Sequence, residues 1–288
     1  MQSRSSSDNQ LPPSEKQDVI PARDSDSSIP GHENENEKDI EKGDPGAQEK
    51  NEVDQGDEDQ RQTEIESNLV GWDGPEDPGN PQNWSKSKKY TTTVFYATLT
   101  FCLTFSSSIF STATMVTAKM YGVSNEVMTL GTSLFVLGFA VGPIVWGPFS
   151  ELYGRKPPLF FGFAIFAIFQ IPVAVAQNVE TIMLSRFLGG MFGSAPLAII
   201  GGALADFWGP VERGFALGLF SGATFIGPVA GPIVGGFITQ SYLGWRWTAW
   251  ITLIMATFFG ILAFFICSES YAPVLLQRKA AKIRYSPT

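Results

Sequence analysis

Arg186 is the residue most able to do electrostatic chemistry inside the apolar part of this chain. It lies in the run MLSRFLGGMFGSAPLAIIGG, six residues after Glu180. An arginine keeps its proton at ordinary pH, so Arg186 could bind an anion or a carbonyl, or tune a titrating carboxylate. Because placing an arginine in a bilayer costs roughly 2.5–3.5 kcal/mol, the simpler alternative is a side chain that reaches back to the membrane surface.

A second charged group lies in the run GPFSELYGRKPP, between two apolar segments. Glu151 and Arg155 are four residues apart, so they can pair if a helical turn continues between them. Gly147 allows close approach of another helix, and Gly154 permits a turn that other residues resist. With Lys156, the group is otherwise a tight loop carrying positive charge.

The third pattern is the uncharged run GFALGLFSGATFIGPVAGPIVGG, which is long enough to cross a bilayer. Its glycines recur every four residues in two sets: the first ladder is Gly214, Gly218 and Gly222, and the second ladder is Gly227, Gly231 and Gly235. Each ladder forms a helix face without side chains, where another helix can pack closely. Pro228 and Pro232 each remove a backbone donor and are expected to bend the helix, and Gly236 ends the motif.

Several kinds of site are disfavoured by composition. His32 is the one histidine and lies in the polar N-terminal region, while Cys102 and Cys267 lie in or beside apolar segments. This argues against histidine-based metal sites and Ser-His-Asp triads in the apolar part, and no P-loop or separate basic nucleic-acid patch is present. We therefore expect no enzyme activity, no metal, no cofactor and no nucleic-acid partner.

Composition also divides the chain. Residues 1–77 hold 22 acidic and 7 basic residues, a net charge of −15, while residues 78–288 hold 6 acidic and 13 basic residues, a net charge of +7. The first part has too few apolar residues to offset ordering entropy, so we expect a disordered acidic tail that serves as a spacer or recruits partners. A basic juxtamembrane segment, 78–89, joins it to the apolar part, 90–267.

Six segments of the apolar part have the length of a membrane-spanning helix. They lie at 90–110, 127–148, 158–176, 181–204, 214–238 and 247–267, and a polar stretch with Lys119 and Glu126 follows the first. In the fourth, Arg186, Gly190, Ser194, Ala198 and Gly202 recur every four residues and would share one helix face. The sequence thus predicts an all-α membrane protein with six transmembrane helices.

The basic residues between these segments fall mostly on one side. If connections alternate across the membrane, ten lie on one side and two, Lys119 and Arg246, on the other. The ten are Lys86, Lys88, Lys89, Arg155, Lys156, Arg213, Arg278, Lys279, Lys282 and Arg284. By the positive-inside rule, both termini are predicted to be cytoplasmic.

Two of these motifs resemble signatures of the major facilitator superfamily. The run from Gly147 to Lys156 resembles Gly-x-x-x-Asp-Arg-x-Gly-Arg-Arg/Lys, with Glu151 in place of the aspartate and Leu152 in place of the first arginine. In that family the loop latches the two halves of the transporter in one conformation. Arg186 with Gly190 resembles the second signature, which is linked to proton coupling.

The span-five run resembles the motif of proton-driven antiporters in that superfamily. It reads Gly227-Pro228, Gly231-Pro232 and Gly235-Gly236. The resemblance implies that it packs against the opposite half of the transporter and closes the inner route to leak. The runs DFWGPVERG and GWRW, and SESYAPVLLQRKAAKIR within residues 268–288, are similar to the fungal drug:proton antiporter branch with twelve spans, the last as the start of its central cytoplasmic loop.

This resemblance covers residues 80–284 and implies the N-terminal half of a fold with two six-helix halves, each made of two inverted three-helix repeats. It implies proton-coupled efflux of small organic molecules or drugs, at the plasma membrane. The implied partners are the lipid bilayer, a substrate, the proton, and a missing second half or second chain. An uptake symporter, or a truncated non-transporting protein acting by association, are the alternatives. No acid lies deep in the six segments, so the titrating group is Glu180 or Asp206 near an edge, or lies in the absent half.

Overall fold

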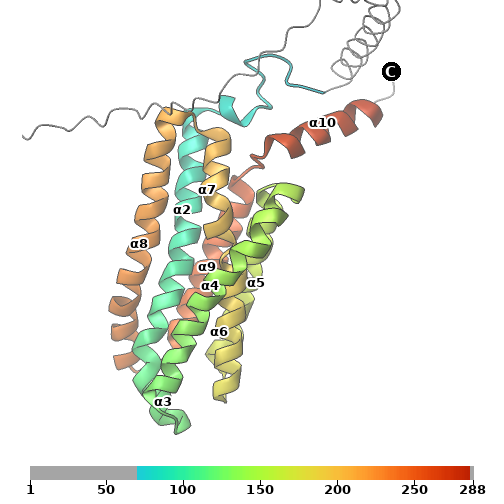
Figure 1. Cartoon of the computed structure of the whole chain (residues 1–288). Coiled ribbons are helices and arrows are strands. Elements are labelled where there is room, and N and C mark those ends of the chain that lie inside the picture. Colours follow the sequence, from blue (N-terminus) through green and yellow to red (C-terminus); the bar gives the residue numbers. More distant parts are fainter. Residues whose placement is uncertain (1–69, 286–288) are drawn as a thin grey trace, which may run out of the picture. The chain divides into compact units, whose positions relative to one another are not determined.

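The computed structural model describes residues 70–285, so the acidic tail up to residue 69 and residues 286–288 lie outside the described part. Within that part the chain is helical, with turns and no strand. The helices, shown in Figure 1, are η1 (Pro81–Asn83), α2 (Lys86–Ile109), η2 (Phe110–Ala113), α3 (Thr114–Tyr121), α4 (Asn125–Tyr153), α5 (Lys156–Val175), α6 (Val179–Gly193), α7 (Ala195–Phe207), α8 (Pro210–Gln240), α9 (Arg246–Ile266) and α10 (Ala272–Tyr285).

Local sequence explains where several of these helices begin and end. The side chains of Ser85, Ser124 and Asn178 each accept a backbone N–H from the first turn of α2, α4 and α6, which satisfies a donor that the helix leaves unpaired. Gly122 ends α3 at φ +65° and Gly154 ends α4 at φ +92°, conformations that glycine adopts readily.

Six stretches are long and apolar enough to cross a membrane, as the sequence predicts. They are Lys86–Tyr121, Asn125–Tyr153, Lys156–Val175, Val179–Phe207, Pro210–Gln240 and Arg246–Ile266. The first differs from expectation, because the stretch expected to be polar continues as η2 and α3 and holds Lys119 within α3. The fourth is broken at Ser194, where Pro196 near the start of α7 lacks the N–H of a continuous helix.

Helix α2 lies at the centre of the bundle and α8 at its margin. α2 contacts α7, α8 and α9, while α4 packs on α6, and α5 on α6 and α9 (Figure 1). In the apolar window of the first stretch 72% of the residues are buried, against 11% in that of α8. The main core includes Leu99, Leu103, Phe166, Ile199 and Phe207, from α2, α5 and α7.

The helix ends define two ends of the bundle. At one, the start of α2 meets the end of α7, where Trp84 stacks on Phe207 with ring centroids 5.5 Å apart. At the other, the hydroxyl of Tyr121 and the guanidinium of Arg246 both donate to the carbonyl of Ala176, at 2.9 and 2.8 Å. We call the first the basic end, because α5, which begins there, carries Arg155 and Lys156 at its start.

The segment before η1 contacts α10. Lys279 of α10 lies 2.7 Å from the carboxylate of Asp73 and 3.5 Å from that of Asp77, and it donates to the carbonyl of Gly71 at 3.0 Å. Asp77 also accepts the backbone N–H groups of Asp73 and Gly79. The hydrogen-bonded part of the chain therefore begins before residue 78, the boundary expected from composition.

Candidate functional site

Arg186 lies on α6 and is buried, with 2% of its surface exposed. Its Nε donates to the carbonyl of Gly131 on α4 at 3.2 Å. Its two terminal nitrogens donate to the carbonyls of Ser106 and Ser107 on α2, each at 3.0 Å. One guanidinium thus joins three helices through backbone oxygens.

Two aromatic rings complete this environment. The guanidinium carbon lies 4.8 Å from the ring centroid of Phe110 and 4.4 Å from that of Phe135. Such contacts favour a cation where water is excluded. The alternative of a side chain that reaches the membrane surface is therefore wrong, and the contacts described for Arg186 are carbonyls and rings rather than a carboxylate.

Gly190, one turn after Arg186, lets α6 pack directly on α4. A Cβ at Gly190 would overlap the carbonyl of Phe135, and one at Gly138 of α4 would lie 2.6 Å from the carbonyl of Phe187. The face that was expected to run on to Gly202 does not continue as one helix, because α6 ends at Gly193. Arg186 and Gly190 thus both hold α6 against its neighbours.

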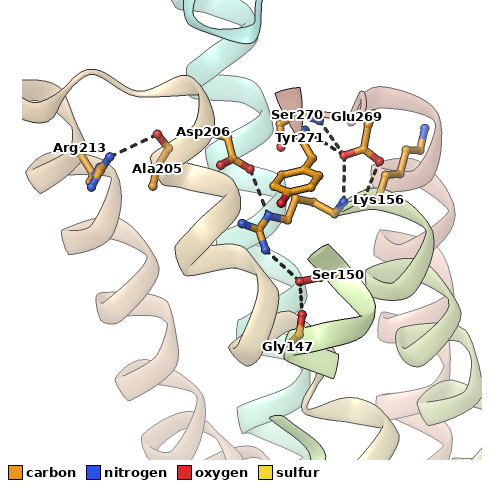
Figure 2. A network of polar contacts seen from close by, with 10 residues as sticks. Gly147, Ser150, Lys156, Ala205, Asp206, Arg213, Glu269, Ser270 and Tyr271 are labelled. Atoms are coloured by element: carbon orange, nitrogen blue, oxygen red, sulfur yellow. Dashed lines mark hydrogen bonds and ion pairs between the residues drawn. The ribbon is translucent and has the colours of Figure 1, made fainter. Parts of the chain in front are cut away.

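At the basic end, the guanidinium of Arg155 is paired with Asp206 of α7, with Nε and Oδ2 3.1 Å apart. It also donates to the hydroxyl of Ser150 on α4 at 2.9 Å and lies 4.7 Å from the ring centroid of Tyr271. The bonds to Asp206 and Ser150 are drawn as dashed lines in Figure 2. Together with the ring contact they tie the end of α4 and the start of α5 to α7 and to the segment after α9.

Glu269 caps the start of α5 (Figure 2). Its carboxylate accepts the backbone N–H groups of Arg155 at 2.9 Å and Lys156 at 3.1 Å, and those of Ser270 and Tyr271, each at 3.0 Å. A negative charge at a helix N-terminus is favourable. Gly154 has a positive φ, and a Cβ there would lie 2.7 Å from Oε2 of Glu269, so a side chain at this position would also displace the capping carboxylate.

The predicted loop motif differs from the structure in two ways. Residues from Gly147 to Tyr153 form the last turns of α4 rather than a loop. The pair of Glu151 with Arg155 is wrong, because the turn at Gly154 separates them and Arg155 points to Asp206. Glu151 is exposed, and a Cβ at Gly147 would meet no atom within 4 Å in the described chain.

The second ladder of α8 packs on α2. Added Cβ atoms at Gly227, Gly231 and Gly235 would overlap or crowd α2 and η2. The one at Gly231 would lie 2.9 Å from the backbone nitrogen of Ile109 in α2, and the one at Gly235 would lie 2.6 Å from Oγ1 of Thr112 in η2. The glycine face of this ladder is thus occupied by span one. The packing of the whole run against an opposite half, which the resemblance implied, stays a prediction.

The first ladder faces open space. No atom lies within 4 Å of a Cβ built at Gly214, Gly218 or Gly222, and the last two line a groove of about 370 Å³ between α8 and α2. Pro228 and Pro232 are exposed and Gly236 is partly exposed. Unlike the face of the second ladder, this open face is not covered by another helix of the described chain.

Within residues 70–285, no group of three His, Cys, Asp or Glu side chains is placed to hold a metal ion. Residues 96–287 match the family model described as Major Facilitator Superfamily. The chain belongs to the major facilitator superfamily. Its six apolar helices thus embed it in a membrane, and its relatives in this superfamily are transporters.

Two fungal members of the superfamily resemble it closely. It is 63% identical over 225 residues to the citrinin biosynthesis cluster MFS transporter of Monascus ruber, a match that covers 78% of this chain and 45% of that protein. It is 54% identical over 220 residues to the ascochitine biosynthesis cluster MFS transporter of Didymella fabae, covering 76% and 43%. The chain spans about half the length of these relatives, which fits one half of such a transporter.

A solved superfamily structure shares the fold. The structure of a proton:xylose symporter bound to 6-bromo-6-deoxy-D-glucose aligns with a TM-score of 0.60 and 17% identity, over 68% of this chain and 48% of that one. At this identity the likeness concerns the fold alone.

The sequence did not reveal that Glu269 caps α5 or that Asp206 pairs with Arg155. Glu269 is the one acid after Glu212 and follows an apolar segment. If connections alternate across the membrane, Glu269 lies on the same side as the helix start Arg155-Lys156-Pro157-Pro158. Its carboxylate could then have been matched with the unpaired backbone N–H groups of that helix start. Nothing in local spacing, however, joins residues 114 positions apart.

Proposed function

We propose that this chain is half of a proton-coupled exporter for a small organic product of a fungal biosynthesis cluster. The observation that carries the proposal is its 63% identity to a transporter named for the citrinin biosynthesis cluster. The antiporter-like run from Gly227 to Gly236 supports the direction of transport by resemblance.

In this proposal Arg186 is a positioning residue. It fixes α2, α4 and α6 relative to one another, because it donates to carbonyls of two of these helices from the third. The basic-end network of Arg155, Asp206 and Glu269 holds the ends of the same bundle. The open face of α8 would meet the rest of the transporter, which supplies or completes the substrate pathway and the proton-titrating group.

We also propose that the basic end faces the cytoplasm, at the plasma membrane. Arg155, Lys156 and Lys279 lie at that end, whereas Arg246 lies at the other. Basic residues favour the cytoplasmic side of a membrane. A membrane-impermeant thiol reagent on intact cells should label Lys119→Cys and spare Lys282→Cys, and the reverse pattern contradicts this orientation.

The transport test uses two preparations in inside-out vesicles. One contains the chain alone, and the other contains it together with the part of the Monascus ruber transporter that it does not cover. With an imposed proton gradient, labelled citrinin should accumulate in the second preparation, and a protonophore should abolish the accumulation. Accumulation without a proton gradient contradicts proton-coupled export. Accumulation in neither preparation also contradicts it, and favours a non-transporting protein that acts by association.

A further inference from the structure

An apolar groove runs between α5 and α9, away from the open face of α8. Its volume is about 600 Å³, within the range of roughly 300–1,000 Å³ typical of ligand pockets. Its lining includes Phe160, Ala164 and Ala167 on α5 and Ala256, Gly260 and Phe264 on α9. The groove therefore suits a hydrocarbon ligand rather than a polar one.

The groove is about as long as one leaflet of a bilayer is thick. On α5 its lining runs from Phe160 to Ile171, which is about 16 Å at the helix rise of ~1.5 Å per residue. The hydrocarbon core of a bilayer is ~30 Å thick, so one leaflet accounts for about 15 Å of it. Because Phe160 lies one turn inside the start of α5 and Phe264 near the end of α9, the groove begins at the basic end.

A cation lies at that end of the groove. Lys156 is four residues before Phe160, and its Nζ lies 4.8 Å from the ring centroid of Phe264. Among the described residues the ammonium of Lys156 has no ion-pair partner. Glu269, which accepts the backbone N–H of Lys156, is occupied by four backbone donors, and Arg155 is paired with Asp206.

We propose that this groove binds an anionic phospholipid, with an acyl chain along α5 and α9 and the headgroup phosphate on Lys156. The apolar lining, the one-leaflet length and the unpaired ammonium at the headgroup level each match one part of such a lipid. A neutral sterol would fill the lining but would gain nothing from Lys156. The inference concerns a lipid site and does not depend on the proposed transport.

The test measures lipid binding to the purified chain in mild detergent by native mass spectrometry. Phosphatidylglycerol is compared with phosphatidylcholine of the same acyl chains, and cholesterol is added as a competitor. Lys156→Gln removes the headgroup contact, and Ala164→Trp fills the groove at an exposed lining position. Lys282→Gln, an exposed cation of α10, is the matched control.

We expect about a fivefold preference for phosphatidylglycerol, in line with the contribution of one lysine near a membrane surface. Lys156→Gln should abolish the preference, and Lys282→Gln should keep it. Ala164→Trp should weaken the binding of both lipids. A phosphatidylglycerol analogue with a photoreactive acyl chain should also crosslink to the peptides that hold Phe160 or Phe264. An unchanged preference in Lys156→Gln, crosslinks elsewhere, full displacement by cholesterol, or a second copy of the chain on the groove would overturn the proposal.

Discussion

The interior of the bundle and its basic end join helices by different kinds of contact. In the interior, Arg186 binds backbone carbonyls, and Gly231 and Gly190 lie directly against the backbones of α2 and α4. At the basic end, Arg155 pairs with the carboxylate of Asp206, and Glu269 caps α5. The interior therefore joins helices through backbone groups, reached by glycines or by Arg186, whereas the basic end also uses the carboxylates of Asp206 and Glu269.

This difference follows from where each region lies. In hydrocarbon, helices gain from close packing and backbone contact, and carboxylates are costly. Near water, ion pairs form at lower desolvation cost but are screened by salt. Added atoms should therefore damage the interior most, while salt and pH should act at the basic end and on the segment beside it.

The largest effect is expected for Gly231→Leu. Its side chain would enter α2 at the backbone of Phe105 and Ile109, 3.0 and 2.9 Å from the Cβ position, and backbone cannot move aside cheaply. Overpacking of this kind costs about 3 kcal/mol of unfolding free energy. Denaturant unfolding in micelles measures it, with Gly218→Leu on the open face as the control that should stay within ~0.5 kcal/mol. Equal losses in both variants would remove the distinction between the two ladders.

Arg186→Ala should come next. It removes three hydrogen bonds between helices, and at ~0.6 kcal/mol for an average bond in a membrane protein the expected loss is about 2 kcal/mol. The loss should not change with salt, since the partners are uncharged carbonyls. The same unfolding assay in low and high salt checks this, with Arg246→Ala, which loses one such bond, as the milder comparison. A wild-type stability for Arg186→Ala would mean that the buried guanidinium holds nothing together.

Glu269→Gln should have a smaller effect that depends on salt. The amide keeps an acceptor for the start of α5 but loses the charge, so we expect a loss of about 1 kcal/mol, comparable to removing a helix cap. High salt should shrink the difference from wild type. Glu151→Gln is the matched control at the same end, because Glu151 is exposed. If both glutamates behave alike, the cap at α5 is not important for stability.

The smallest effect is expected at the contact of Asp77 with Lys279, which should respond to pH. Hydrogen bonds from the backbone N–H groups of Asp73 and Gly79 lower the pKa of Asp77 below its ordinary value of 3.8, and pairing with Asp73 raises the pKa of Lys279 above 10.5. The contact should thus persist from about pH 4 to 10.5. It should weaken as pH falls through the lowered pKa of Asp77, and also as pH rises through the raised pKa of Lys279.

A distance measurement between spin labels at Gly71→Cys and Arg278→Cys can follow this contact across that pH range. Asp77→Asn should lengthen the distance and loosen the contact within that range, because Lys279 then keeps Asp73 as its one carboxylate partner. A distance that stays constant through both transitions would show that the ion pairs do not hold the segment to α10.

Much of the fold was predictable, because membrane spans are encoded by local apolar runs. All six were expected, and membership of the superfamily that the motifs resemble is confirmed. The extension of span one through α3 was missed, since Lys119 suggested a loop while Ala118 and Thr117 pack inside. The break at Ser194 was missed because spacing by four residues looks the same on one helix as on two.

The site was predictable in its residues but not in their partners. Arg155, Arg186 and the second ladder stood out by type and spacing. The partner of Arg155 is Asp206, those of Arg186 are backbone carbonyls of α2 and α4, and that of the second ladder is the face of span one from Thr104 to Thr112, all distant in sequence. Backbone carbonyls carry no sequence signal, which is why Arg186 could be interpreted as a snorkelling or cavity residue.

The most direct test of this account is disulfide crosslinking between α8 and span one, at its η2 segment, in native membranes with Cys102 and Cys267 replaced by alanine. The pair Thr112→Cys and Gly235→Cys lies in direct contact. The control pair joins Thr112→Cys to Gly222→Cys, which sits about 20 Å further along α8 at ~1.5 Å per residue. The account predicts rapid crosslinking of the first pair and none of the second. No crosslink at Gly235, or equal crosslinking of both pairs, would contradict packing of the second ladder on span one.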